Sequence, residues 1–146
     1  MDVQKRALVI GINAYGRGIP PLASAVRDAE AVARQLEQGH GYQVALLRDA
    51  GASASAILTT LAALVDGGLT ADSSFVLYYA GHGIAADDAE HTGPKGFLLA
   101  HDADVKDQST WLGMDALRGA LDGLTARHLM LVLDCCYAGA FQWAST

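Results

Sequence analysis

The sequence predicts an α/β fold in which helices cover both faces of a mostly parallel sheet. Short apolar runs of strand length alternate along the chain with segments whose apolar residues recur every three or four positions. The short runs are apolar at consecutive positions, which is typical of strands that are buried on both faces. Glycines follow the periodic segments, as they commonly do at the ends of helices. Strands separated by helices in this way predict a parallel sheet between two helical layers.

The elements are expected in the following order. The first strand is at 7–12 (ALVIGI), and a helix from Leu22 to Gln38 follows, with one apolar face and with Gly39 and Gly41 at its end. A second helix begins after a serine cap at Ser53 or Ser55 and stops at Gly67 and Gly68, and Leu117, Leu121 and Leu124 mark a third helix. The remaining strands are expected at 42–47, 74–80 and 128–134. Residues 84–110 are polar around a short apolar piece, and we interpret them as a surface loop or hairpin near the functional site.

Composition limits the classes of function. A chain of 146 residues, of which 51% are hydrophobic, is expected to form one globular domain over 1–146. Its net charge of −6 argues against nucleic-acid and anionic-membrane partners. The two cysteines are adjacent and so provide no disulfide framework, which suits a reducing compartment. The start lacks the features of a signal peptide and no apolar run is long enough to span a bilayer, so we expect a cytoplasmic protein.

Two of the predicted strands end in residues that carry chemistry. The strand at 74–80 runs into Gly-His-Gly at 81–83, and the strand at 128–134 runs into Asp-Cys-Cys at 134–136. Parallel strands end at the same edge of a sheet, where ligands usually bind, so His82 and one of the thiols are expected to meet there. An imidazole beside a thiol takes its proton or raises its thiolate fraction, and backbone N–H groups stabilise the oxyanion that forms when the sulfur attacks an amide. The glycines beside His82 let the backbone approach a substrate closely.

Each feature alone has a simpler interpretation. A buried cysteine is usually inert, and a single histidine after a strand is more often a hydrogen-bonded turn residue than a base. The two patterns together favour a cysteine hydrolase, although the residues alone do not tell which thiol reacts. A nucleotide-binding loop at 11–18 (GINAYGRG) is disfavoured, because Arg17 and Gly18 stand where the lysine and the hydroxyl residue of that motif belong.

The two motifs resemble those of a known family. FVLYYAGHG (75–83) and LVLDCCYAGAF (131–141) resemble the catalytic motifs of caspase-like cysteine proteases, closest to metacaspases and their bacterial relatives. ALVIGINAY and the following helix with AVRDA are similar to the opening strand and first helix of that family. His82 lies 54 positions before Cys136, near the caspase spacing of about 50. The resemblance implies a three-layer caspase-like fold and a cysteine endopeptidase with a Cys-His dyad, capable of self-processing.

The resemblance also assigns roles to residues. Cys136 is the implied nucleophile, Cys135 fills a variable position, and His82 is the implied base. The backbone N–H groups of Gly83 and Cys136 are the implied oxyanion donors. Because neighbouring side chains of a strand point to opposite faces, Cys135 is expected to lie against the core or on the far side of the loop. No third member of a triad is evident in the sequence.

Two carboxylates are expected to set specificity. In metacaspases, as the resemblance implies, the residues at the positions of Asp28 and Asp134 line the primary specificity pocket and select arginine or lysine before the scissile bond. Two carboxylates in a cleft favour a guanidinium through charge-assisted hydrogen bonds. For Asp28, an ordinary acidic residue on a helix surface is an equally good interpretation. Asp134 is expected to be a buried carboxylate at a strand end and therefore to have a partner.

The resemblance raises two further questions. Many metacaspases need calcium, but the acidic residues Asp102, Asp104 and Asp107 do not fit an EF-hand loop, and we expect neither a metal nor a cofactor. The family's fold continues into a small subunit with further strands, and this chain resembles the large subunit only. We therefore expect a small-subunit segment of the same protease to cover the strand edge after 128–134, in addition to protein or peptide substrates.

Two other functions remain open at this point. One is a catalytically weak caspase-like adaptor module in a signalling assembly, although the retained His82 and Cys136 argue against it. The other is a cysteine hydrolase that acts on an amide outside proteins. Labelling with an arginine-containing electrophilic peptide distinguishes these functions from a protease.

Overall fold

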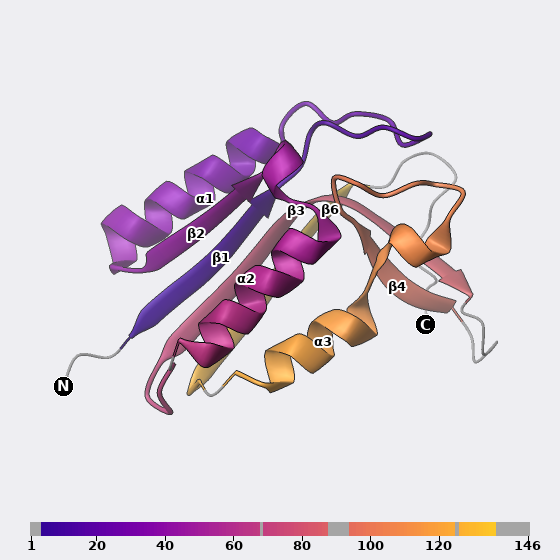
Figure 1. Cartoon of the computed structure of the whole chain (residues 1–146). Helices are drawn as coiled ribbons and strands as arrows, with labels where there is room; N and C mark the ends of the chain where they lie inside the picture. Colours follow the sequence, from indigo (N-terminus) through magenta and orange to yellow (C-terminus); the bar gives the residue numbers. More distant parts are fainter. Residues whose placement is uncertain (1–3, 68, 88–93, 125, 137–146) are drawn as a thin grey trace.

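The structure, a computed structural model, describes residues 4–67, 69–87, 94–124 and 126–136 (Figure 1). Three α-helices, two short 3₁₀ helices (Asp49–Gly51 and Gln108–Thr110) and six strands lie within these ranges. The α-helices and strands are β1 (Lys5–Gly11), α1 (Ala25–His40), β2 (Gln43–Arg48), α2 (Ala54–Asp66), β3 (Ser74–Asp87), β4 (Pro94–Leu99), β5 (Leu112–Gly113), α3 (Met114–Asp122) and β6 (His128–Cys136). No helix of the described ranges combines the length and apolarity needed to cross a bilayer.

The six strands form one sheet, and β3 lies at its centre. β1 and β6 both run parallel to the first half of β3, while β4 pairs with its second half in the antiparallel direction. His82 pairs with Leu99 of β4 and with Cys136 of β6, so β4 and β6 lie at opposite edges of β3. β1 also pairs with the edge of β3 that faces away from β6. β1 and β4 therefore lie one after the other along that same edge of β3. β2 completes the sheet beyond β1, and β5 beyond β4.

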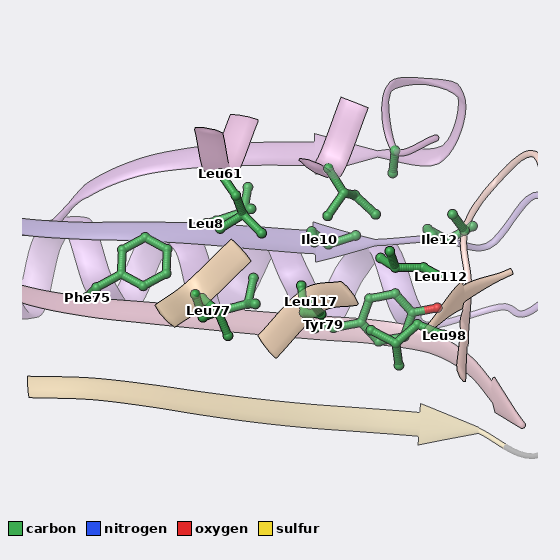
Figure 2. Close-up of a cluster of buried hydrophobic side chains, with 14 of the residues drawn as sticks. Leu8, Ile10, Ile12, Leu61, Phe75, Leu77, Tyr79, Leu98, Leu112 and Leu117 are labelled. Atoms are coloured by element: carbon green, nitrogen blue, oxygen red, sulfur yellow. The ribbon is translucent and has the colours of Figure 1, made fainter. Parts of the chain in front are cut away.

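Helices cover both faces of this sheet, with α1 on one face and α2 and α3 on the other (Figure 1). Figure 2 shows the larger of the two main clusters, in which Leu61 of α2 and Leu117 of α3 pack on strand residues such as Leu8 and Phe75. The smaller cluster lies under α1 and is built from small residues. A Cβ on Gly11 would lie 2.6 Å from the Cβ of Ala29, so glycine is what lets α1 sit this close to β1. The predicted three-layer α/β fold is confirmed.

In the region 84–110, residues 84–87 and 94–99 are paired antiparallel strands, as in the hairpin interpretation, whereas residues 100–110 form turns and a short 3₁₀ helix (Gln108–Thr110). β3 continues to Asp87 instead of ending at residue 80, and it pairs with β4 from His82 onward. Ile84, Leu98 and Leu99 are buried, which explains why this arm belongs to the core. His82 is therefore within a strand, at the position where β3 changes neighbours.

The first helix begins at Ala25, three residues later than its apolar pattern suggested. The side chain of Asn13 accepts a hydrogen bond from the N–H of Val26, and the C=O of Asn13 accepts one from Leu22. Asn13 thus caps the helix from the preceding loop and holds residue 22 outside it. At the other end, Gly41 adopts the left-handed conformation that commonly ends a helix (φ 73°).

β6 departs from the expectation that all strands are covered on both faces. Leu129 and Met130 are 49% and 59% exposed, although they project from opposite faces of the strand. Within the described ranges, β3 is the strand that pairs with β6. β6 therefore presents two apolar faces and one strand edge that the described part of the chain leaves uncovered.

Candidate active site

The structure brings the two sequence motifs together. β3 and β6 are parallel neighbours, and their register places His82 directly opposite Cys136. The same register places Ala80 opposite Asp134. Both motifs thus lie where the parallel ladder of β3 and β6 ends, which corresponds to the sheet edge where α/β sheets usually bind their ligands, although β3 itself continues to Asp87. The backbone of Cys136 is described, whereas its side chain lies outside what the structure describes.

The imidazole of His82 is buried and hydrogen-bonded. Its Nε2 lies 2.8 Å from the carbonyl oxygen of Pro20, and the side chain is 1% exposed. A carbonyl oxygen only accepts, so in the neutral ring Nε2 carries the proton and Nδ1 is the acceptor. The ring of Tyr15 lies against the imidazole with 4.8 Å between the two centroids. Besides His82 and Cys136, the carbonyl of Pro20 is thus the third group at this site. A backbone carbonyl is present in every residue, so its role cannot be recognised in a sequence.

Two tyrosine hydroxyls hold the backbone of His82. The N–H of His82 donates to the hydroxyl of Tyr15 at 2.9 Å, and the hydroxyl of Tyr79 donates to the C=O of His82 at 2.8 Å. The hydroxyl of Tyr15 also donates to the carbonyl oxygen of Leu99 at 2.8 Å. The single proton of Tyr79 is shared between the carbonyl oxygens of His82 and Leu99, and the Leu99 oxygen lies at 2.9 Å. Burial is the main cause that raises the pKa of Tyr79 well above its ordinary value, and Tyr15 adds to the effect. Tyr79 therefore remains a neutral donor. In the sequence, the two tyrosines stand out only as parts of a strand and of the opening motif.

The loop that carries Tyr15 and Pro20 is fixed by Asp49. The Oδ1 atom of Asp49 accepts hydrogen bonds from the N–H groups of Asn13 (2.8 Å) and Ala14 (2.9 Å). Asp49 itself has a positive φ of 44° at the end of β2, a conformation that aspartate tolerates better than most residues. No sequence pattern indicates this contact, because it joins residues that are distant along the chain.

The N–H of Gly83 points toward the edge of β3 that β6 occupies. The C=O of Ala80 accepts from Ile12, just beyond β1, so the backbone groups of residues 80 and 82 face the opposite edge. Backbone groups alternate between the two edges along a strand, which directs those of Gly83 toward β6. The ladder between β3 and β6 ends at His82 and Cys136. The N–H of Gly83 therefore lies next to the end of β6, where the oxyanion donor was predicted.

The two described residues before Cys136 face opposite sides of the sheet. Cys135 is half-buried and packs against the larger hydrophobic cluster, as predicted. The Oδ2 atom of Asp134 accepts a hydrogen bond from the hydroxyl of Tyr78 at 3.2 Å, and Tyr78 belongs to the cluster under α1. Cys135 thus lies on the α2 side of the sheet and Asp134 on the α1 side.

The carboxylates that were expected to set specificity differ in burial. Asp134 is exposed within the described part of the chain, so the expectation of a buried carboxylate was wrong, because β6 lacks cover on the α1 side there. It nevertheless has the expected partner, the hydroxyl of Tyr78. Asp28 is half-buried in the first turn of α1, the helix that covers the same face. The structure places both carboxylates on the α1 side of the sheet.

The acidic residues at 102–107 have local structural roles. Asp102 accepts a hydrogen bond from the N–H of Ala54 at the start of α2. Asp104 accepts from the N–H of Lys106, and Asp107 from the N–H and hydroxyl of Ser109. Among the residues that the structure describes, no three potential metal ligands converge. These carboxylates act as turn and cap acceptors.

Comparisons with known proteins agree with this fold. The family model of the caspase domain matches residues 4–144. The crystal structure of protein GSU0716 from Geobacter sulfurreducens is similar to this chain with a TM-score of 0.76 and 22% identity, over 93% of this chain and 52% of that one. The chain thus spans about half the length of that protein, and at this identity the likeness concerns the fold alone. The search of curated proteins found no match. Since the caspase domain model matches nearly the whole sequence, the chain belongs to the caspase domain family.

Proposed function

We propose that this chain is the large-subunit portion of a cysteine endopeptidase in which Cys136 is the nucleophile and His82 the base. The observation that carries the proposal is the register that pairs these two residues on adjacent parallel strands. Neighbouring strands lie about 4.8 Å apart. Side chains at paired positions on one face of the sheet can therefore contact each other without any loop movement.

The proposed reaction follows from the hydrogen bonds of His82. Nδ1 takes the thiol proton, and the Nε2 bond to the carbonyl of Pro20 stabilises the resulting imidazolium. The thiolate attacks the substrate carbonyl carbon, and the N–H groups of Gly83 and Cys136 donate to the oxyanion. The C–N bond then breaks as His82 gives its proton to the leaving amine. Water hydrolyses the remaining thioester with the same imidazole as base.

Cleavage after arginine or lysine is the proposed specificity. Asp134 and Asp28 both lie on the α1 side of the sheet, and position 136 shares that face with Asp134 by strand alternation. A basic side chain that precedes the scissile bond would then be held by one or both carboxylates. The net charge of −6 adds a general attraction for basic peptides.

A matched pair of cysteine variants tests the nucleophile. A peptide that ends in arginine and an electrophilic ketone is expected to add covalently to the wild-type protein and to Cys135→Ala, but not to Cys136→Ala, as measured by intact mass spectrometry. His82→Ala is expected to slow the labelling by a factor on the order of 10² or more. Labelling that depends on Cys135 instead would contradict the proposed nucleophile.

We also propose that a small-subunit segment of the same protease packs along β6. The support is the exposure of Leu129 and Met130 and a groove of about 300 Å³ between α3 and β6, which Leu117 and Leu131 help to line. Without such a partner, exposed apolar faces on an edge strand promote aggregation. The labelling test is therefore repeated on a longer protein that includes this segment, and self-processing after arginine or lysine is expected there. No labelling of any such protein would favour the adaptor function. The reduced thiol that the reaction needs favours a cytoplasmic location.

A further inference from the structure

The hydrogen-bond ladder of β3 is completed by side chains at one position. Along the edge that β1 and β4 share, the C=O of Ala80 accepts from Ile12, and the next residue facing that edge is His82, opposite Leu99. At this position β3 changes from a parallel to an antiparallel neighbour. The N–H and C=O of His82 bind the hydroxyls of Tyr15 and Tyr79, and both hydroxyls bind the carbonyl of Leu99.

We infer that Tyr15 and Tyr79 are positioning residues, whose two hydroxyls fix the backbone of His82. In this position Nε2 donates to the carbonyl of Pro20, and Nδ1 is the acceptor for the proton of the thiol at position 136. The inference rests on the proposed function, in which His82 is the base. Neither tyrosine takes part in bond making or breaking. Their role is to hold both backbone groups of one residue at the point where the strand ladder changes direction.

The geometry around the two hydroxyls leaves little room for another arrangement. The hydroxyls lie 3.4 Å apart, and Tyr79 is fully buried. A Cβ on Gly81 would lie 2.6 Å from each hydroxyl oxygen, so glycine at this position is required by the tyrosine pair. Tyr15 also lies against the imidazole through its ring. It therefore contacts His82 twice, at the backbone through the hydroxyl and at the side chain through the ring.

The experiment removes the hydroxyls and keeps the rings. Tyr15→Phe and Tyr79→Phe are each prepared with ¹⁵N-labelled histidine, and the ring nitrogens of His82 are observed by NMR, since protonated and bare nitrogens differ clearly in shift. In the wild type, Nε2 is expected to be protonated in the neutral ring. Both variants are expected to lose this single tautomer, and the alkylation rate of Cys136 near neutral pH is expected to fall tenfold to a hundredfold, about the effect of a small misplacement of a catalytic group. The pH profile of alkylation is expected to change together with the rate.

Three further variants separate positioning from stability. Tyr42→Phe removes a hydroxyl at the opposite end of the sheet, before β2, and is expected to leave the His82 signals unchanged. Ile57→Val weakens the core under α2 without touching the site and is expected to lower thermal stability only. Gly81→Ala keeps both hydroxyls but displaces them, and it is expected to change the His82 signals as the phenylalanine variants do.

The outcomes are distinguishable from those of the proposed function. Wild-type-like His82 signals and alkylation in the folded phenylalanine variants would overturn the inference, as would the same changes in Ile57→Val. If one of the two phenylalanine variants does not fold, the other variant and Gly81→Ala test the inference. The NMR observation needs no peptidase activity, so the positioning of His82 is measured independently. The proposed function is contradicted instead when a longer protein that includes the small-subunit segment is not labelled by the arginine peptide.

Discussion

At the scale of single residues, the proposed site divides into side chains that we propose carry the chemistry and groups that orient them. The sequence predicted His82, Cys136 and Asp134 because thiols, imidazoles and carboxylates at strand ends are recognisable in a sequence. It did not predict the carbonyl of Pro20, because every residue has a carbonyl and only the fold brings this one to Nε2. The side-chain type of a residue is visible in a sequence, whereas a contact between distant residues is not.

Asp134 offers a test of specificity at this scale. Asp134→Asn keeps an oxygen that accepts from the hydroxyl of Tyr78, but it removes the negative charge. The labelling rate with the arginine peptide is expected to fall about tenfold to a hundredfold, since a hydrogen bond to a charged group is worth about 1.5–3 kcal/mol. The measurement is the second-order rate constant of labelling. Asp28→Asn is expected to act in the same direction.

The control for this test is Asp66→Asn at the far end of α2, which changes the net charge equally and is expected to leave the rate unchanged within a factor of two or so. Equal losses in Asp134→Asn and Asp66→Asn would assign the effect to overall charge, and the carboxylate would have no pocket role.

At the scale of the elements, the extent of each strand depended on its neighbours. The apolar pattern of 74–80 predicted the part of β3 that is buried between β1 and β6. It missed the arm to Asp87, because Gly-His-Gly at 81–83 has low strand propensity and only the pairing with β4 makes it a strand. β6 shows the converse case, since its apolar sequence predicted burial that the described part of the chain does not provide.

The exposed faces of β6 lead to a prediction about association. Met130→Lys places a charge on a side chain that is 59% exposed, so the free energy of unfolding is expected to change by no more than about 0.5 kcal/mol. Self-association of this chain at high concentration is expected to decrease, because charged residues protect edge strands from pairing. Sedimentation velocity measures the association, and urea unfolding measures the stability.

Thr59→Lys, on the exposed side of α2, adds the same charge away from β6 and serves as the control. If both lysine variants reduce association equally, net charge rather than β6 governs it. A large destabilisation in Met130→Lys would show that β6 is buried in the free chain.

At the scale of the whole molecule, the sequence predicted the helical and sheet layers, but it did not predict which strands pair with which along β3. Apolar periodicity determined which segments are strands and which are helices, and alternation of the two determined the parallel sheet between helical layers. The change of neighbour along β3 has no counterpart in the sequence pattern, yet it is where His82 lies. The candidate site thus lies where the hydroxyls of Tyr15 and Tyr79 complete the hydrogen bonds of β3.

The stability of the whole fold is expected to depend on Tyr79 in alkaline solution. Burial first, and then Tyr15, raises the pKa of Tyr79 well above its ordinary value of 10.0 in the folded protein. Above that ordinary value the unfolded chain loses the phenol proton while the folded chain retains it, so the unfolded state binds fewer protons. The contribution of Tyr79 is therefore fully present below pH 10 and decreases as pH rises toward the folded pKa, by about 1.4 kcal/mol per pH unit.

Urea unfolding of the wild type and Tyr79→Phe at several pH values between 8 and 11 measures this effect. The variant is expected to be less stable at pH 8, by about 1–3 kcal/mol, because the carbonyl of His82 loses its phenol donor inside the core. It is also expected to lose less stability between pH 10 and 11 than the wild type does, so the two curves approach each other. Parallel curves for Tyr79→Phe and the wild type would mean that the phenol of Tyr79 ionises as readily in the folded protein as in the unfolded chain, and the buried, neutral hydroxyl that holds His82 would lose its support.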